Sequence, residues 1–460
     1  MTPTAELIQP EVAELVRSHA YSELRAALEG IPPADVADII LSLEPAERAV
    51  CFRFLTRDDA GEVFSYLEPE IQEELISKLG DAALRVVEGM DPDDRVRLLD
   101  ELPTEVAQRL IASLTPEDRR ETQAILGYPP ESVGRLMNPD YIRLKPEWTI
   151  GHALEHIRKY GNDAETINVV YVVDDRGVLI DDIRLRSLLL ANPADTVESL
   201  MNQNFVGLRA DQDQEDAVRM MARYDRIVLP VVDSRGVLLG IVTSDDVADV
   251  AEAEATEDIQ KLGGVEALEQ AYIHTGPVEM FRKRGVWLSA LFIGQTITIL
   301  VLGGFQDQLD KAVVLSLFMP LVMSCGGNSG SQAAALITRA LALGEVAPRD
   351  WARIVRKELL SSLMLAAALA CMGFVCVEVF VRTMVVKTDH VFPLAATIGV
   401  AVALVVVWGT MLGSMLPLLL RRSGFDPATA SSPMVATLMD ASGTLIYLGV
   451  AILVLTGTIL

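Results

Sequence analysis

The chain has 460 residues, a net charge of −25 and 50% hydrophobic residues, but its two halves differ sharply. Residues 1–260 carry 52 acidic and 25 basic side chains, a net of −27, whereas residues 261–460 carry 12 acidic and 14 basic ones, a net of +2. The acidic part offers no basic face to phosphate groups, so nucleic acid is excluded as a partner. We expect no cleaved signal peptide, because no basic segment precedes an apolar one at the start. The four cysteines lack metal-ligand spacing. We interpret them as small packing residues of a protein on the reducing side of a membrane rather than as a disulfide framework.

Residues 1–130 contain an internal repeat. Leu43-Glu44-Pro45, Leu67-Glu68-Pro69, Met90-Asp91-Pro92 and Leu114-Thr115-Pro116 recur every 23 or 24 residues. Each step places a helix-breaking turn and a capping residue before a short amphipathic helix. The pattern predicts an acidic, all-α superhelical solenoid, which is a binding surface rather than a catalytic one.

Residues 131–250 change to β-branched strands. Residues 169–179 match residues 228–238 at a shift of 59, each as a strand, an Asp/Gly turn and a second strand. This region resembles a tandem pair of CBS modules, the Bateman arrangement, which has an α/β fold. The second copy fits that family through residues 240–246, but the first has Asp181-Asp182-Ile183-Arg184 in the corresponding place and Ser187 where an Asp is usual. ATP is a possible ligand of such modules, and these departures argue against it at one of the two clefts.

An acid-rich connector follows at residues 251–284, predicted as a helix. Helical spacing places Glu254, Glu257 and Asp258 on one face, where like charges repel unless a cation neutralises them. A solvated helix face is the alternative interpretation. Arg282, Lys283 and Arg284 indicate the cytosolic edge of a membrane.

The remaining residues, 285–460, predict a transmembrane domain of five helices. The apolar segments cover residues 285–305, 312–338, 358–381, 391–419 and 431–458. Basic residues gather between the second and third segments and between the fourth and fifth. By the positive-inside rule, the chain is a multi-pass protein of the inner (plasma) membrane with its soluble domains in the cytosol and its carboxyl terminus outside.

Asp440 is the single charged residue of residues 431–460. A carboxylate in hydrocarbon costs about 2.5–3.5 kcal/mol and usually faces a bundle interior or a water-filled path. Ala436, Thr437 and Gly443 share its helical stripe, and Pro433 precedes them. We therefore predict a cation site in a pore, with a protonated or hydrogen-bonded carboxylate as the alternative.

The second apolar segment contains a run of small and polar residues from Cys325 to Gln332, including Gly327 and Asn328. Such a run offers oxygen atoms to an ion path, or else allows close helix packing. One carboxylate per subunit suits Mg²⁺, which keeps most of its waters, better than Ca²⁺ with its six to eight oxygen ligands. No histidine lies well inside a span, which disfavours a Zn²⁺ or Cu⁺ path.

Taken together, the order of domains resembles the MgtE family of magnesium channels and transporters throughout the chain. The segments that carry the resemblance are Glu252–Ile259, Gly326–Gln332 and Pro433–Asp440. The resemblance implies a homodimer with Asp440 in the pore. It also implies that cytosolic Mg²⁺ bridges acidic residues of the solenoid, the CBS pair and the connector, or plug helix. Mapped by motif, these are Glu62, Asp94, Glu215, Asp225, Asp246, Asp249, Glu254, Glu257 and Asp258.

We therefore expect a non-enzymatic protein that conducts Mg²⁺ down its electrochemical gradient and closes when cytosolic Mg²⁺ is high. Apposed acidic faces repel, and each bridging Mg²⁺ neutralises two charges. Two alternatives remain open: a proton- or sodium-coupled exporter of divalent cations, and a non-conducting membrane sensor built on the CBS pair. No nucleophile–base constellation in the sequence suggests an enzyme.

Overall fold

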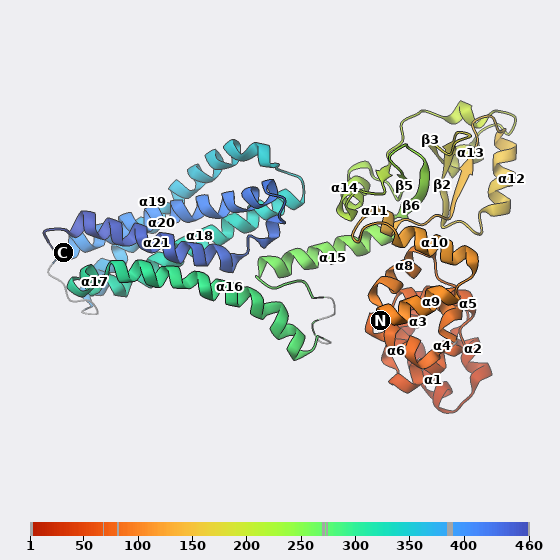
Figure 1. Ribbon diagram of the computed structural model, residues 1–460, viewed down its shortest axis with the longest axis horizontal. Coiled ribbons are helices and arrows are strands. Elements are labelled where there is room, and N and C mark those ends of the chain that lie inside the picture. Colours follow the sequence, from red (N-terminus) through yellow and green to blue (C-terminus); the bar gives the residue numbers. More distant parts are fainter. Residues whose placement is uncertain are drawn as a thin grey trace. The chain divides into compact units, whose positions relative to one another are not determined.

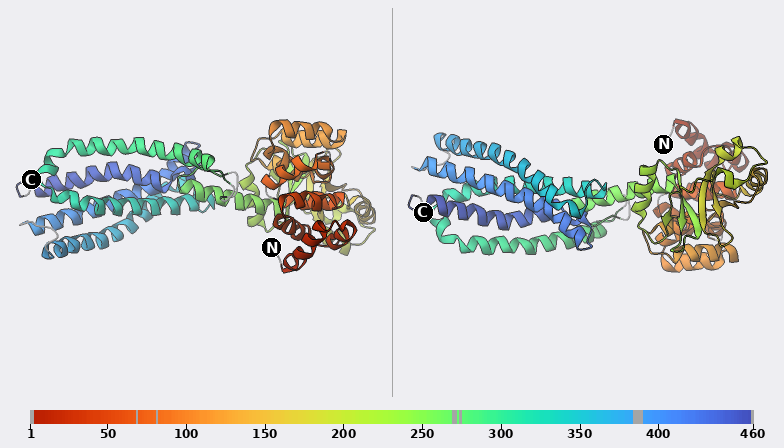
Figure 2. Two further views of the ribbon diagram at one scale, coloured as in Figure 1. Left: turned by 90° about the horizontal axis from the view of Figure 1, so that it is seen from below. Right: turned by 90° about the horizontal axis from the view of Figure 1, so that it is seen from above.

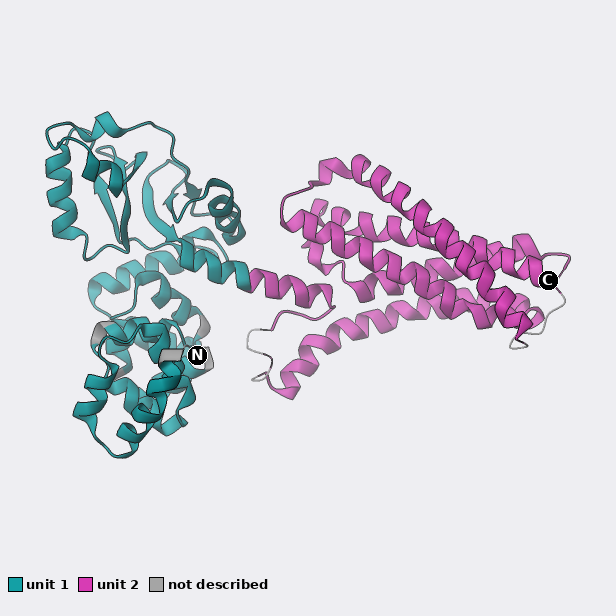
Figure 3. Ribbon diagram, turned by 180° about the vertical axis from the view of Figure 1, so that it is seen from behind, with its two compact units in different colours: residues 1–252 teal, residues 253–460 magenta. Residues whose placement is uncertain are grey.

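The computed structural model describes residues 3–67, 69–80, 82–268, 272, 275–383 and 390–458 (Figure 1). The chain forms two compact units, residues 1–252 and residues 253–460 (Figure 3).

The first part of unit 1 consists of short helices around one apolar core. In chain order they are α1 (Pro3–Arg17), α2 (Tyr21–Leu28), α3 (Pro33–Ser42), α4 (Pro45–Arg53), α5 (Arg57–Ser65), α6 (Pro69–Leu79), α7 (Ala82–Val87), α8 (Pro92–Glu101), α9 (Thr104–Ser113) and α10 (Pro116–Leu126). The side chains of Thr56 and Thr115 cap α5 and α10 as the repeat predicts, by accepting from the backbone N–H groups of Asp59 and Asp118. Asp91 stands at the N-cap of α8 but makes no capping bond. The predicted helical repeat is confirmed.

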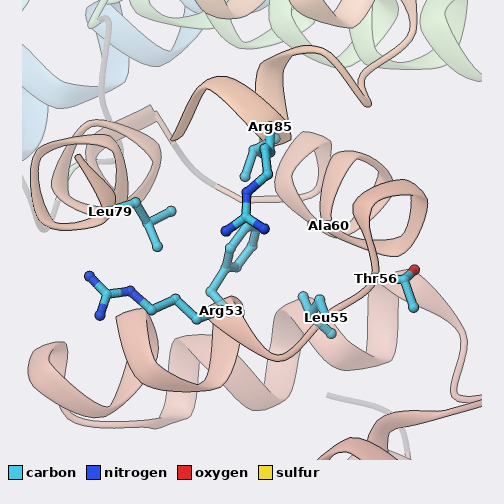
Figure 4. Close-up of a pocket in the computed structure, with 8 residues that line it drawn as sticks. Arg53, Leu55, Thr56, Ala60, Leu79 and Arg85 are labelled. Carbon is cyan, nitrogen blue, oxygen red and sulfur yellow. The ribbon is translucent and has the colours of Figure 1, made fainter. Parts of the chain in front are cut away.

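A small hollow of about 70 Å³ lies beside the helices of this domain. Arg53, Thr56 and Arg85 contribute its polar lining, and the Arg85 guanidinium points into it (Figure 4). Arg53 donates a hydrogen bond to the Lys78 carbonyl at 3.4 Å. The charged groups that line the hollow are thus the two guanidiniums of Arg53 and Arg85.

The rest of unit 1 contains two small sheets with the strand orders β1-β2-β3 and β4-β5-β6. The elements are α11 (Val133–Leu136), β1 (Tyr141–Leu144), α12 (Ile150–Tyr160), β2 (Thr166–Val173), β3 (Leu179–Arg184), α13 (Leu185–Leu190), η1 (Val197–Leu200), β4 (Leu208–Arg209), α14 (Gln214–Tyr224), β5 (Val228–Val232) and β6 (Leu238–Thr243). In each sheet the first pair of strands is parallel and the second antiparallel. Val170 pairs with Ile183, and Leu229 pairs with Val242, which is the same register 59 residues later. The tandem α/β modules are therefore confirmed.

Unit 2 is a bundle of long helices that lie side by side (Figure 2). It contains α16 (Pro277–Gly304), α17 (Gln306–Lys311), α18 (Val314–Ala342), η2 (Pro348–Asp350), α19 (Trp351–Arg382), α20 (Val391–Arg422), η3 (Pro427–Thr429) and α21 (Ser432–Leu455). Four of the described helices, α16, α19 (with η2), α20 and α21, are long and apolar enough to cross a membrane. The segment predicted as the second span is the 29-residue helix α18. Helix α18 is not among these four, because its run of glycine, serine and asparagine lowers its hydropathy. Length and composition thus support four of the five predicted spans, and the fifth stays a prediction.

The connector differs from the single helix predicted for residues 251–284. Helix α15 (Ser244–Leu262) begins inside the CBS pair and ends at Leu262, and α16 begins at Pro277. Gly264 turns the chain after α15 with a φ of +73°. A Cβ atom there would lie 2.8 Å from Trp287 Nε1, so only glycine fits this close approach.

Helices α18 and α20 meet backbone to backbone at four glycines. A Cβ atom on Gly409 would lie 2.4 Å from the Gly326 carbonyl oxygen, and one on Gly413 would lie 2.0 Å from that of Gly330. Small residues one turn apart on both helices permit this approach. Close packing therefore explains Gly326 and Gly330. Gly327 faces elsewhere, because a Cβ atom on it would lie 4.0 Å from the Ala436 Cα and Cβ atoms.

Candidate functional site

Asp440 lies on α21, about 12 Å along the helix from its first residue at ~1.5 Å per residue. Its side chain is half-buried, and Gln295 Nε2 of α16 donates a hydrogen bond to its Oδ2 at 3.1 Å. The Asp440 backbone carbonyl accepts from Thr444 Oγ1 at 2.5 Å. The partner that the structure gives this carboxylate is thus a neutral amide. Sequence reasoning did not single out Gln295, although it is a polar residue in the first apolar segment.

Most of the other predicted pore residues lie on α21 or contact it, and Asn328 does not. Ala436 faces Gly327 of α18, and the Thr437 hydroxyl donates to the Pro433 carbonyl at 3.0 Å. Gly443 is buried, and a Cβ atom on it would lie 3.2 Å from the sulfur of Met323. Asn328 is exposed on α18 and donates to Ser324 Oγ within its own helix at 3.2 Å.

A second site lies within unit 1, where the start of α8, the segment before β2 and the start of α15 converge. We call it the acidic cluster; its members are Asp91, Asp93, Asp94, Glu165, Asp245 and Asp246. Asn138 Nδ2 donates to Asp93 Oδ1 at 3.2 Å and to Glu165 Oε2 at 3.0 Å. One amide thus joins the helical-repeat domain to the CBS pair.

Burial and mutual repulsion raise the carboxyl pKa values in the acidic cluster. Burial is the first cause for Asp91, Asp93, Asp94, Glu165 and Asp246. For Asp93 the charges of Asp246 and Asp94 follow, and the pKa of Asp93 lies well above its usual range. The pKa of Glu165 rises to about 7 and that of Asp246 to about 6. Carboxylates in such a place favour either a proton or a cation as their neutralising partner.

Arg97 and Glu62 lie beside the acidic cluster but are not members of it. Arg97 donates to Asp94 at 2.7 Å and to Asp249 at 3.1 Å, so one guanidinium connects these two predicted ligands. Glu62 is exposed on α5, and its charge contributes to the raised pKa of Asp91. Across the described parts of the chain, no three acidic, histidine or cysteine side chains are arranged to hold a metal ion directly.

Sequence reasoning found Asp94 and Asp246 but missed Asp91, Asp93, Glu165 and Asp245. The run from Asp91 to Asp94 was visible as a repeat step and was interpreted as a helix start. Glu165 and Asn138 had no local signal, because only the tertiary fold brings them to α8.

The two predicted ligands on α14 lie outside the acidic cluster. Glu215 accepts from Arg219 at 2.8 Å, and Asp225 ends the helix in a left-handed conformation with a φ of 49°. Non-glycine residues rarely adopt this conformation, and Asp is among those that tolerate it best.

The predicted connector acids belong to unit 2. Glu254 and Asp258 are half-buried, and Glu257 forms an ion pair with Lys261. Lys261 Nζ also donates to Asp426 beside η3 at 2.6 Å. Burial lowers the pKa of Lys261, but the two carboxylates outweigh it and raise that pKa. The end of α15 is thus tied to the segment that precedes α21, a contact that the sequence did not reveal.

The unusual residues of the first CBS copy have a structural explanation. Asp181 occupies the position of Gly240, and its carboxylate accepts from the backbone N–H groups of Asn202 at 2.6 Å and Gln203 at 3.0 Å. In the second copy a Cβ atom on Gly240 would lie 2.7 Å from the Asn138 carbonyl oxygen. Asp182 pairs with Arg226 at 2.8 Å.

A cleft of about 530 Å³ lies between the two copies. Arg184 and Arg186 contribute cationic groups to its lining, and Leu189 and Ile227 contribute aliphatic ones. These groups fit the phosphates and the flat base of a nucleotide, so the replaced residues do not by themselves exclude ATP.

Three family models match this chain. They are the MgtE divalent cation transporter over residues 319–450, the MgtE intracellular N domain over residues 31–131, and the CBS domain over residues 133–193 and 197–253. A helical acidic domain, a CBS pair and an apolar helix bundle in this order define a membrane protein with a soluble N-terminal part. The chain belongs to the MgtE family.

The relatives support this assignment over nearly the full length. The magnesium transporter MgtE of Thermus thermophilus is 40% identical over 98% of this chain and 99% of its own. The magnesium transporter MgtE of Bacillus subtilis is 30% identical over 95% of this chain and 95% of its own. A crystal structure of the cytosolic domain of the Mg²⁺ channel MgtE in complex with ATP is 37% identical, with a TM-score of 0.51, and covers 53% of this chain and 99% of that one.

Proposed function

We propose that this protein is a magnesium channel or transporter that admits Mg²⁺ down its electrochemical gradient, with Asp440 as the cation site of the pore. The observation that carries the proposal is the carboxylate within an apolar helix, hydrogen-bonded to the neutral amide of Gln295. The amide orients the carboxylate without neutralising it by an opposite charge, which leaves its other oxygen available to a cation. The names of the relatives favour Mg²⁺ as that cation.

Outer-sphere binding explains how such a site passes a divalent ion. Mg²⁺ sheds its waters reluctantly, so one carboxylate attracts the hydrated ion without trapping it. Ala436 and Gly327 leave room for the hydration shell beside α21 because neither carries a long side chain. The membrane potential adds about 2.3 kcal/mol per charge per 100 mV. Pro433, Thr437, Gly443 and Asn328 complete the proposed lining.

Five spans, including α18, and a homodimer belong to this proposal. Helix α18 has 29 residues, about 43 Å at ~1.5 Å per residue, which is more than a ~30 Å hydrocarbon core requires. With the amino terminus in the cytosol, five spans place the carboxyl terminus outside. Asp440 is half-exposed in one copy of the chain, which leaves it accessible to a path between two copies.

Closure by cytosolic Mg²⁺ follows from the acidic groups. Its proposed ligands in unit 1 are Asp94 and Asp246 of the acidic cluster together with Glu62, Asp249, Glu215 and Asp225, and those of the connector are Glu254, Glu257 and Asp258. An ion at 100 times its dissociation constant favours the bound state by ~2.7 kcal/mol. Two or three such sites supply the ~5.5 kcal/mol that moves a gate from 1:99 to 99:1. ATP at the CBS cleft is a further regulatory ligand that the lining permits.

Mg²⁺ flux into liposomes that hold the purified full-length chain and an internal dye tests this function. Asp440→Asn should abolish flux and leave assembly intact, whereas Asp307→Asn, outside the four apolar helices, should conduct normally. Flux retained by Asp440→Asn would remove Asp440 from the pore. A fixed dependence on a proton or sodium gradient would favour a coupled exporter, and no flux under any gradient would favour a CBS-based sensor.

The gate has its own test. Neutralising the connector acids, as Glu254→Gln, Glu257→Gln and Asp258→Asn together, should leave a channel that stays open at millimolar Mg²⁺. If that triple variant still closes at the Mg²⁺ concentration of the unmodified protein, the connector is not a sensor.

A further inference from the structure

Two histidines lie one helical turn apart on α12 of the CBS pair. His152 is exposed and His156 is half-buried, and α12 runs without interruption from Ile150 to Tyr160. Residues at positions i and i+4 share one helix face, with Cβ atoms ~5–6 Å apart. That spacing allows both imidazoles to bind the same metal ion.

The two rings share a contact that brings them to the same place. The Trp148 ring lies 4.7 Å from the His152 ring and 5.0 Å from the His156 ring, centroid to centroid. Both contacts are edge-on, and the His156 ring also lies 4.7 Å from that of Tyr160. Packing against one indole limits the motion of both imidazoles, which lowers the entropy lost when a ligand orders them.

His156 also borders an open hollow of about 400 Å³. Asp140 and Asp163 contribute carboxylates to its lining, so water molecules and acidic groups are available near the imidazole. Burial, followed by the charges of His152, Lys159 and Arg143, lowers the pKa of His156. The neutral imidazole, which is the form that binds metals, is therefore favoured at pH 7.

We propose that His152 and His156 form a site for a borderline divalent transition metal ion such as Ni²⁺, Cu²⁺ or Zn²⁺, with water completing the coordination. Imidazole suits these ions, with nitrogen–metal distances of ~2.0–2.1 Å for Zn²⁺, whereas Mg²⁺ prefers oxygen. The site is separate from the acidic cluster in its residues and in its ligand chemistry. It gives the regulatory domain a means to distinguish transition metals from the ion that the pore admits.

Trp148 provides the measurement, because Ni²⁺ and Cu²⁺ held beside an indole quench its fluorescence. The full-length protein in detergent at pH 7.5, with 5 mM Mg²⁺ present to occupy the carboxylates, is titrated with Ni²⁺. The Trp148 signal is taken as the difference from Trp148→Phe. We expect saturable quenching by Ni²⁺ in the unmodified protein. In His152→Ala the Ni²⁺ concentration at the midpoint should rise at least ~10-fold, because removing even an outer-shell partner of a metal ligand lowers the affinity by that much.

Arg158→Ala, on the same helix, is the matched control and should leave the midpoint unchanged. Lowering the pH to 5.5 should weaken metal binding by the unmodified protein, because protons compete with the metal ion for the imidazole nitrogens; this arm needs no substitution. Absence of saturable quenching, or an unchanged midpoint in the His152→Ala, His156→Ala double variant, would overturn the proposal.

Discussion

Replacing Asp246 by asparagine should stabilise unit 1 in the absence of Mg²⁺ and weaken its response to Mg²⁺. Asp246 Oδ2 accepts from Thr243 Oγ1 at 2.6 Å, and an asparagine Oδ1 atom can still accept that bond. The substitution therefore removes a charge while it keeps the shape and the hydrogen bond. Asp246 and its neighbours in the acidic cluster repel one another, so the loss of one charge relieves the others.

The size of the effect follows from the pKa of Asp246, which is raised from 3.8 to about 6. At ~1.36 kcal/mol per pH unit, keeping this side chain ionised in the fold costs up to about 3 kcal/mol. Because the folded pKa is raised, the stability that the neutral acid contributes is complete below pH 4 and is lost as the pH rises through 6. The substitution should therefore stabilise the protein fully at pH 8, about half as much at pH 5, and have little effect below pH 4.

Thermal unfolding followed by Trp148 fluorescence measures this difference, because the other three tryptophans lie in residues 253–460. For a unit of this size, 3 kcal/mol corresponds to a rise in Tm of about 6–12 °C in EDTA at pH 8. Saturating Mg²⁺ should raise the Tm of the unmodified protein more than that of Asp246→Asn. The control is Asp175→Asn, at an exposed pair with Lys145. Equal Mg²⁺ shifts in both variants, with no gain in EDTA, would refute the reasoning.

Three further outcomes are expected. Gly413→Ala places a Cβ atom against a backbone oxygen and should destabilise the helix bundle by about 1–3 kcal/mol. The control Gly449→Ala, where a Cβ atom would meet nothing within 4 Å, should leave the stability unchanged. Equal unfolding temperatures for the two variants would contradict the backbone contact. Lys261→Met removes the ion pair with Asp426 and should raise the Mg²⁺ concentration for half-closure about tenfold, for a loss of ~1.4 kcal/mol; an unchanged value would show that this pair does not couple the connector to the gate. Mg²⁺ affinity, measured by calorimetry, should fall between pH 8 and pH 6 as Glu165, with a pKa of about 7, takes up a proton; a constant affinity would exclude the acidic cluster as the site.

Much of the fold could be predicted because its signals are local. The repeat around Leu43 and Leu67 places a proline and a capping residue at each helix start, and a shift of 59 residues fixes the register of both sheets. Asp440 was identifiable because hydrocarbon tolerates few charges. The structure brings it beside Gln295, a residue from another helix that no local pattern connects to it.

The acidic cluster was predicted only in part for the same reason. Asp94 and Asp246 came from motifs, while Asp93 and Glu165 are connected through Asn138, which lies far from both in the sequence. Burial of like charges is a property of the folded chain, and it cannot be counted from composition. The end of the connector helix at Leu262 was also missed, although Gly263, Gly264 and Pro277 stand in the sequence as helix breakers.

The glycine contact between α18 and α20 determines which parts of the bundle can move at low cost. Side chains between two helices can change rotamer and so absorb a small displacement, but Gly409 and Gly413 have none to adjust. Separating the two backbones there would open a gap that no residue can fill, so displacing α18 from α20 is costly. Helix α16 meets α21 through side chains that can change rotamer, those of Thr437 beside Gly294 and of Gln295 at Asp440. The element that follows the connector in the chain is therefore also the one best able to change the surroundings of Asp440.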